Sequence, residues 1–87
     1  MVKEIRTVPY FDRRYRKLPL KVKKKAKEKE NIFRNNPFDS RLHTHKLHGE
    51  NENSWAFWID YTYRIKFVFL AKEEVLFLDI GTHDMYK

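Results

Sequence analysis

The stretch TYRIKFVFLAKEEVLFLDI, residues 62–80, decides the fold class of this sequence. Every second residue in its first half is aromatic or aliphatic: Tyr63, Ile65, Phe67 and Phe69. Because side chains alternate across a strand, this pattern predicts a strand over residues 62–70 that directs Arg64 and Lys66 to the opposite face. Residues 71–73 predict a turn, and the nearly continuous apolar run at residues 75–80 is typical of an interior strand.

Two more strands are predicted just before this stretch. Aromatic and aliphatic side chains lie on both sides of the strand predicted for SWAFWID, residues 54–60, so we expect both of its faces to be at least partly covered. The polar residues 50–53 predict a hairpin loop, and residues 45–48 predict a short strand before a turn at Gly49.

Residues 1–37 predict one strand and two helices. Residues 2–8 predict the strand, which ends at Pro9, and proline suits the first turn of a helix. Aromatic and aliphatic side chains then recur at intervals of three and four as far as Leu18, where Pro19 interrupts the pattern. The second predicted helix begins at Pro19, carries one apolar stripe and ends at the Asn-Asn-Pro of residues 35–37.

These elements predict an α+β domain of two layers over residues 1–87: an N-terminal strand, two helices, then an antiparallel sheet of three to four strands. Both helices are expected on the face of the sheet that carries the alternating apolar side chains. The other face would remain open, and Arg64 and Lys66 would make it cationic. A chain of 87 residues leaves no room for a second domain.

The charge is distributed unevenly along the chain. Residues 1–30 contain twelve Lys and Arg against four Asp and Glu, whereas residues 31–87 contain seven against eight. A polyanion is the natural partner of the first part. Three lysines of the second predicted helix are therefore candidates for RNA binding: Lys21, Lys24 and Lys25. The alternative is that these lysines only keep one face of the helix solvated.

The composition argues against several classes of protein. The chain has no cysteine, which excludes disulfides and thiolate metal ligands. His43, His45 and His48 are close in sequence, but no further ligand pattern completes a zinc site, so we expect neither a metal nor another cofactor. No segment approaches the roughly 18 apolar residues that cross a bilayer, and the first residues do not resemble a signal peptide. We expect a cytoplasmic protein with no membrane partner.

The remaining polar residues suit the cleavage of RNA without a metal. They combine imidazole, guanidinium, ammonium and phenol groups: His45, Lys46, Arg64, Lys66, His83 and Tyr86. A base can take the proton of a 2′-hydroxyl, cations can hold the charge of the phosphorane, and an acid can protonate the leaving oxygen. Trp58 or Tyr86 would stack on an unpaired base. The alternative for each residue is an exposed or packing role.

Three strings resemble the RelE/ParE superfamily of bacterial and archaeal toxins over essentially the whole chain. They are His45-Lys46-Leu47-His48-Gly49, then Trp55 with Tyr63-Arg64, and then residues 79–86, DIGTHDMY. The resemblance is greatest to the YafQ-like and YoeB-like mRNA interferases. It implies a ribosome-dependent endoribonuclease that cuts messenger RNA and is silenced by an antitoxin protein.

The same resemblance implies roles for individual residues. His83 matches the catalytic histidine near the C-terminus, Arg64 matches the arginine that contacts the phosphate, His45 matches the histidine of the HxLxG string, and Tyr86 lies near the terminal aromatic residue. The chain departs from the YafQ-like pattern at Asp79, where those toxins carry an arginine. It also has no clear counterpart of their second histidine and aspartate around residues 60–63.

Two other functions remain open. A ParE-like toxin would use this scaffold to inhibit DNA gyrase without cleaving RNA, although gyrase inhibition does not require an imidazole at the end of the sheet. A catalytically decayed member would only bind RNA or a protein. In each case, an acidic and partly disordered antitoxin segment could cover the cationic open face.

Overall fold

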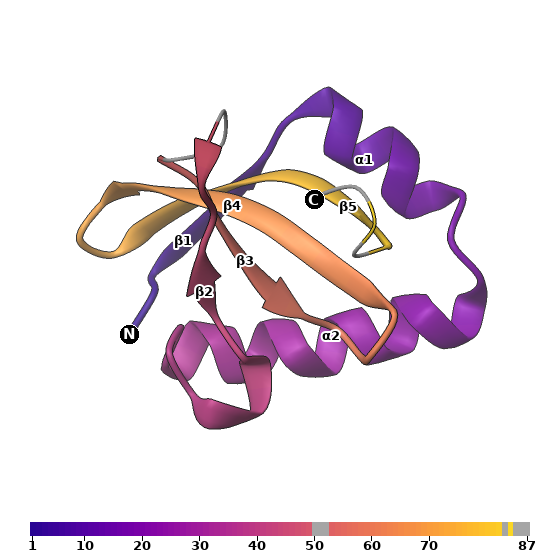
Figure 1. The fold of residues 1–87 in the computed structure, drawn as a ribbon, viewed down its shortest axis with the longest axis horizontal. Coiled ribbons are helices and arrows are strands. Elements are labelled where there is room, and N and C mark those ends of the chain that lie inside the picture. Colours follow the sequence, from indigo (N-terminus) through magenta and orange to yellow (C-terminus); the bar gives the residue numbers. More distant parts are fainter. Residues whose placement is uncertain (50–52, 83, 85–87) are drawn as a thin grey trace.

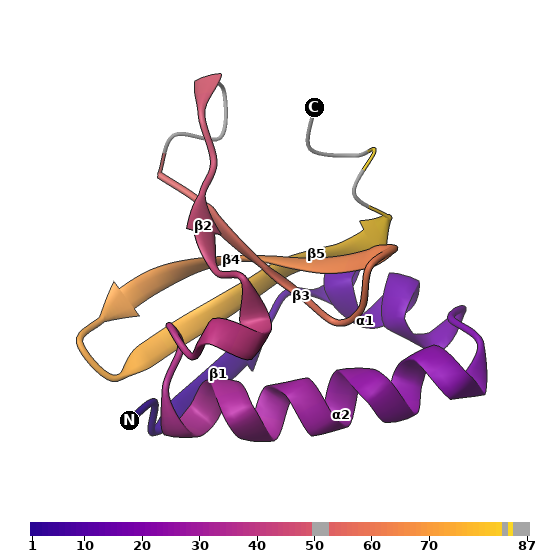
Figure 2. The same cartoon turned by 60° about the horizontal axis from the view of Figure 1, so that its bottom comes forward.

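The computed structural model describes residues 1–49, 53–82 and 84. Its elements are β1 (Glu4–Thr7), α1 (Pro9–Arg16), α2 (Leu20–Asn35), the 3-10 helix η1 (Ser40–Leu42), β2 (His45–Lys46), β3 (Trp55–Trp58), β4 (Tyr63–Ala71) and β5 (Glu74–Thr82). Both α-helices lie on one face of the sheet (Figure 1, Figure 2). Among the described residues, no α-helix covers the other face, which we call the open face. The predicted α+β architecture of two layers is confirmed.

The sheet has five strands in the order β1-β5-β4-β3-β2. β1 runs parallel to β5, and every other pair of neighbours is antiparallel. The four strands after the helices are antiparallel, as predicted, but the predicted size of three to four strands was wrong, because the N-terminal strand joins the sheet as a fifth, parallel edge strand. Backbone hydrogen bonds make this pairing, and β1 has only one residue that is not exposed, Ile5, so its side-chain pattern does not reveal its partner.

Local sequence explains the bounds of the two helices. Pro9 occupies the first turn of α1, Asp12 lies in that turn, and arginines fill the last turn, which complements the helix dipole at both ends. α2 has no side-chain cap, so it depends on the apolar stripe that it buries: Val22, Ala26 and Phe33. Packing against the sheet therefore stabilises this lysine-rich helix despite the repulsion among its charges.

Phe33 is the centre of the core between α2 and the sheet. Its ring is fully buried and lies 4.7 Å from the ring of Phe57, 4.9 Å from that of Phe67 and 5.7 Å from that of Phe77. These three partners come from β3, β4 and β5, so one side chain of α2 contacts three neighbouring strands.

A β-bulge changes which face the end of β5 presents. Phe77 pairs with Phe67 and Asp79 pairs with Lys66, so Leu78 is an extra residue without a cross-strand partner. After the bulge Ile80 is buried in the core. Asp79 is consequently the neighbour of Lys66 on the open face.

Candidate active site

The register of the sheet shows which side chains share the open face, because residues directly opposite each other on neighbouring strands point to the same side. One row across the open face contains His45, Ala56, Lys66 and Asp79. The next row contains Trp58, Arg64 and Gly81. The predicted candidates His45, Trp58, Arg64 and Lys66 therefore lie on one face of the sheet.

Arg64 is on this face but is not the exposed cation that its sequence pattern predicts. Only 7% of its surface is exposed. Its Nη1 donates hydrogen bonds to the carbonyl oxygens of Asp60 and Tyr61, both at 2.7 Å, and to that of Tyr63 at 3.2 Å. Burial lowers the pKa of the guanidinium, and the charge of Asp60 partly offsets this effect. Arg64 thus holds the β3–β4 turn in place through one nitrogen, Nη1. Within the described part of the chain, its other two nitrogens, Nε and Nη2, have no hydrogen-bond acceptor.

Trp58 lies between His43 and Arg64. The guanidinium carbon of Arg64 is 4.1 Å from the Trp58 ring centroid, and the His43 ring stacks on Trp58 with centroids 3.8 Å apart. Arg64 approaches from β4, whereas His43 lies between η1 and β2, and β4 and β2 flank β3 on opposite sides. Both faces of the indole are covered, so Trp58 has no free face for the base that we predicted it to bind.

His45 has a defined tautomer in its neutral form. Its side chain is exposed, and Nδ1 lies 2.9 Å from the carbonyl oxygen of His43. A carbonyl oxygen only accepts hydrogen bonds, so Nδ1 carries the proton and Nε2 keeps its lone pair. His45 can therefore act as a base through Nε2 on the open face.

Lys46 does not lie with these residues. It pairs with Trp55, which shares the helix-covered face with Phe57 and Phe67. Our prediction that Lys46 stands beside Arg64 at one phosphate is therefore not supported, because alternation along β2 directs neighbouring side chains to opposite faces.

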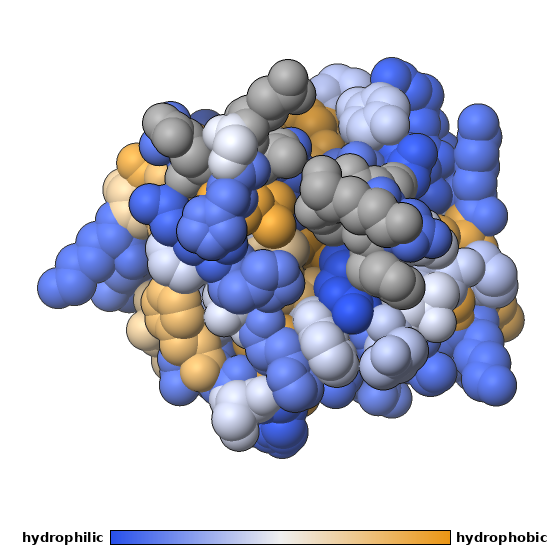
Figure 3. Space-filling view, viewed as in Figure 1, coloured by the Kyte–Doolittle hydropathy of each residue, from blue (hydrophilic) through white to orange (hydrophobic). Residues whose placement is uncertain are grey.

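The predicted RNA-binding lysines have different surroundings. Lys21 and Lys24 are exposed on α2, whereas Lys25 places Nζ 3.4 Å from Oδ2 of Asp60. Lys66 is half-buried on the open face between Ala56 and Asp79. The face of the molecule seen in Figure 3 is largely hydrophilic over the described residues. Of the three α2 lysines that we predicted to bind RNA, two are therefore exposed and the third is bound to the β3–β4 turn.

His83 and Tyr86 lie outside the described residues. β5 ends at Thr82, whose cross-strand partner is Tyr63, immediately after the Gly81–Arg64 pair. The end of this strand is therefore next to Arg64.

Three residues near Arg64 were not predicted to belong to the site: His43, Asp60 and Tyr61. His43 has a positive φ of 51° at the end of η1, a conformation that histidine adopts more readily than most residues, and no local pattern indicated its stacking on Trp58. Tyr61 is 77% exposed. An aromatic residue in a tight turn between two strands was a signal that could have identified Tyr61.

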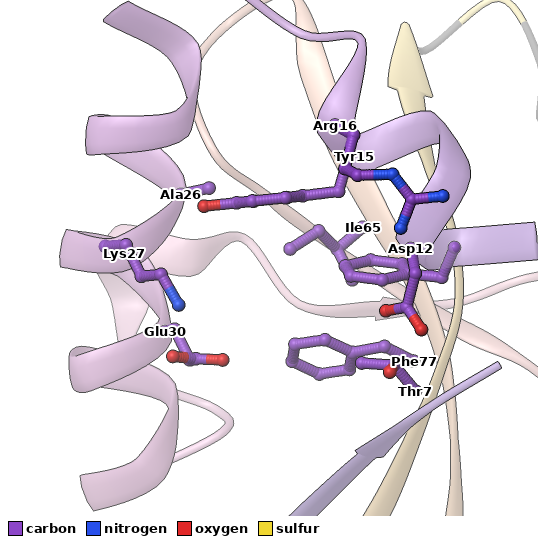
Figure 4. A pocket seen from close by; sticks show the side chains of 10 residues that line it. Thr7, Asp12, Tyr15, Arg16, Ala26, Lys27, Glu30, Ile65 and Phe77 are labelled. Carbon is purple, nitrogen blue, oxygen red and sulfur yellow. The ribbon is translucent and has the colours of Figure 1, made fainter. Parts of the chain in front are cut away.

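A pocket of about 300 Å³ lies on the opposite side of the sheet, between α1 and α2. Phe77, Ile65 and Tyr15 form its apolar part, while Lys27 and Glu30 of α2 face Asp12 and Arg16 of α1 across it (Figure 4). Its two basic and two acidic side chains balance in charge, and none of its lining residues is a histidine. The open face is therefore the better candidate for acid–base chemistry.

Two further properties concern the described residues alone. None of their helices is long and apolar enough to span a membrane. They also contain no group of three or more His, Asp or Glu side chains arranged to hold a metal ion.

Two aspartates, Asp39 and Asp60, make the stability of the folded protein depend on pH in the acid range. The side chain and backbone N–H of Arg41 lower the pKa of Asp39 from its ordinary 3.8 to about 2. Burial raises the pKa of Asp60, but hydrogen bonds from the N–H groups of Tyr63 and Thr62 and from Lys25 lower it by more. Such groups stabilise the folded state above the unfolded pKa, and this contribution disappears as the pH falls through the folded pKa.

We therefore expect the free energy of unfolding to fall between about pH 4 and pH 2. Urea titrations at several pH values in this range measure it. The Asp39→Asn variant should be less stable at pH 6 and should lose less on acidification. An unchanged acid dependence in this variant would show that Asp39 is not one of the groups responsible.

No protein-family model matches the sequence, and no curated protein matches it. Its structure, by contrast, is similar to several solved structures. The YoeB/ParE toxin from Agrobacterium tumefaciens superposes with a TM-score of 0.79 and 12% sequence identity, over 93% of this chain and 99% of that one. The E. coli DinJ-YafQ toxin-antitoxin complex gives a TM-score of 0.75 and 16% identity, over 98% and 97%.

The archaeal RelE-RelB complex from Pyrococcus horikoshii OT3 gives a TM-score of 0.73 and 14% identity, over 94% of this chain and 96% of that one. Identities this low establish a shared fold. The chain therefore has the fold of the RelE/ParE toxins, which confirms, at the level of the fold, the resemblance seen in its sequence.

Proposed function

We propose that this protein is the toxin of a toxin–antitoxin pair and that it cleaves messenger RNA on the ribosome, in the cytoplasm. The observation that carries this proposal is the placement of the His45 imidazole and the Arg64 guanidinium on one face of the sheet that no described α-helix covers. The shared fold and the net charge of +7 agree with it. Lys21 and Lys24 would contact ribosomal RNA, and Lys66 would contact the messenger.

The proposed reaction is the attack of a 2′-hydroxyl on the adjacent phosphorus. Nε2 of His45 takes the proton of the hydroxyl, and the oxygen forms a bond to phosphorus. Arg64 donates from Nε and Nη2 to the phosphorane oxygens as their negative charge grows. The bond to the 5′-oxygen breaks, and His83 gives that oxygen a proton. The products are a 2′,3′-cyclic phosphate and a 5′-hydroxyl, and the step needs no metal or other cofactor.

Arg64 would act here as a positioned group. Its contacts with the turn carbonyls and with Trp58 fix the guanidinium before substrate binds, so little side-chain entropy is lost in the transition state. Tyr86 would contact the RNA beside His83.

The aspartate at position 79 carries the opposite charge to the arginine of YafQ-like toxins, and it pairs with Arg14, whose Nε lies 2.8 Å from Oδ1. Arg14 of α1 thus places a guanidinium beside Asp79.

The proposed protein partner is an antitoxin with an acidic segment that covers the open face. The solved DinJ-YafQ toxin-antitoxin complex, in which a protein of this fold is bound to an antitoxin, supports the existence of a protein partner. Acidic side chains would complement Lys66 and the exposed lysines of α2, and the segment would order as it binds. The identity of the gene next to this one tests the partnership directly.

Inducible expression in bacteria tests the proposed activity. We expect wild-type protein to stop translation and to leave transcripts with new 5′-hydroxyl ends, because cleavage releases that group. Incorporation of labelled methionine and mapping of transcript ends measure the two effects. The His83→Ala variant, expressed to the same level, is the matched control and should leave transcripts intact.

Other outcomes would contradict this proposal. Induction of the DNA-damage response without transcript cleavage would favour a gyrase inhibitor. Normal growth at high expression of folded protein would favour a protein that only binds RNA or a partner.

A further inference from the structure

Tyr61 is more exposed than any other large hydrophobic side chain in the described part of the chain, at 77%. It belongs to the turn between β3 and β4, where its ring meets the ring of Trp58 edge-on, with centroids 6.0 Å apart and planes at 81°. The two rings are perpendicular, and most of the phenol ring remains open to solvent. Proteins that bind single-stranded nucleic acids stack unpaired bases on aromatic side chains of this kind.

The turn that carries Tyr61 is fixed from several directions. Oδ1 of Asp60 accepts hydrogen bonds from the backbone N–H groups of Thr62 at 2.9 Å and Tyr63 at 2.8 Å. Lys25 holds Oδ2 of the same carboxylate, and Nη1 of Arg64 donates to the carbonyl oxygen of Tyr61 itself. Because the backbone of the turn is already rigid, less conformational entropy is lost when a partner binds.

Two cations are bound to the turn that carries Tyr61. The guanidinium of Arg64 is hydrogen-bonded to the Tyr61 backbone, and Lys25 is bound to the preceding residue. Exposed Lys21 and Lys24 lie on the same helix as Lys25, within one turn of it. A largely exposed aromatic ring on a turn that binds two cations matches the two parts of a nucleotide, because a base stacks on the ring and its phosphate meets the charge.

We propose that Tyr61 is a stacking site for one unpaired base of a single-stranded nucleic acid whose backbone runs past Arg64. This inference rests on the proposed function, which supplies the class of ligand. Trp58 supports the site from below and cannot replace it, because His43 and Arg64 cover both faces of the indole. The binding energy comes from stacking, so the site accepts any base.

Binding of short oligonucleotides that cannot be cleaved tests the proposal. The probes are a ten-residue RNA with 2′-O-methyl groups at every position and an abasic strand of the same length and charge. Tyr61→Ala should weaken binding of the first by about 10-fold, within the range for loss of one stacked base, and should leave binding of the abasic strand unchanged. Tyr61→Phe keeps the ring and should bind like the wild type.

Tyr10→Ala is the matched control. Tyr10 is 46% exposed on α1 and also lies beside guanidinium groups, with the carbon of Arg14 at 5.5 Å from its ring centroid. This variant should bind both oligonucleotides like the wild type.

The proposal is overturned if Tyr61→Ala binds the methylated RNA as tightly as the wild type, or if it weakens binding of both strands equally. The former result would leave Tyr61 as a contact for a protein partner. Because the probes are not cleaved, the outcome is independent of the nuclease: RNA binding that depends on Tyr61 without any transcript cleavage would reject the proposed activity alone.

Discussion

Replacing Arg64 by glutamine is expected to slow transcript cleavage by about 100- to 1,000-fold, the usual effect of removing one preorganised donor from a developing oxyanion. The guanidinium is held by three carbonyl oxygens and by the Trp58 ring, so its remaining donors are positioned before the substrate arrives. Cleavage of a messenger by purified ribosomes and toxin measures the rate. The loss should appear mainly in kcat, because the charge on the phosphorane exists only in the transition state.

The same substitution removes hydrogen bonds that hold the β3–β4 turn, so the effect on folding has to be separated from the effect on chemistry. Glutamine can still donate to one of the turn carbonyls. The melting temperature and circular dichroism spectrum of each variant show whether it is folded under the conditions of the assay, and rates are compared only where it is.

Arg6→Gln is the matched control for Arg64→Gln. It removes the same charge from an exposed arginine on the edge strand β1, where Arg6 pairs with Glu4 and Glu74. We expect its cleavage rate to stay near that of the wild type. If both variants were slowed equally, the overall positive charge, and not a positioned guanidinium, would explain the loss.

The alternation in residues 62–70 predicted the orientation of β4 because one face of that strand meets a core of aromatic rings. Ile65 and Phe67 are buried as expected, and Arg64 and Lys66 share the opposite face. The alternation of apolar residues indicates which face of a strand is buried, because only the residues on that face have to be apolar. It does not report what a polar side chain meets after it leaves the strand, so the burial of Arg64 under its own turn was not predictable.

Two other features of the site also depend on contacts that leave no local pattern. The bulge at Leu78 is hidden within an apolar run, because a single extra leucine fits either face of an interior strand. His43 reaches Trp58 only through the pairing of β2 with β3 and a positive φ. The position of Lys46, in contrast, was predictable, since neighbouring residues of one strand cannot both face the same phosphate.

Replacing Phe33 by alanine is expected to lower the free energy of unfolding by about 3–5 kcal/mol, the usual cost of truncating a fully buried phenylalanine. The ring contacts Phe57, Phe67 and Phe77 at once, so its removal leaves a cavity that no single strand can close. A domain of this size has a total stability of about 5–10 kcal/mol, so this variant should lose a large part of its stability. Chemical denaturation at 25 °C measures the change.

The exposed Phe38 supplies the control for this prediction. Its ring is 54% exposed and lies 5.4 Å from that of Trp55 and 6.0 Å from that of Phe69. Phe38→Ala should therefore cost only about 1 kcal/mol or less. Equal costs for the two variants would mean that the core is not centred on Phe33. The strands that carry Arg64, Trp58 and Asp79 would then be held against the helices by other contacts, and Phe33→Ala would leave the open face intact.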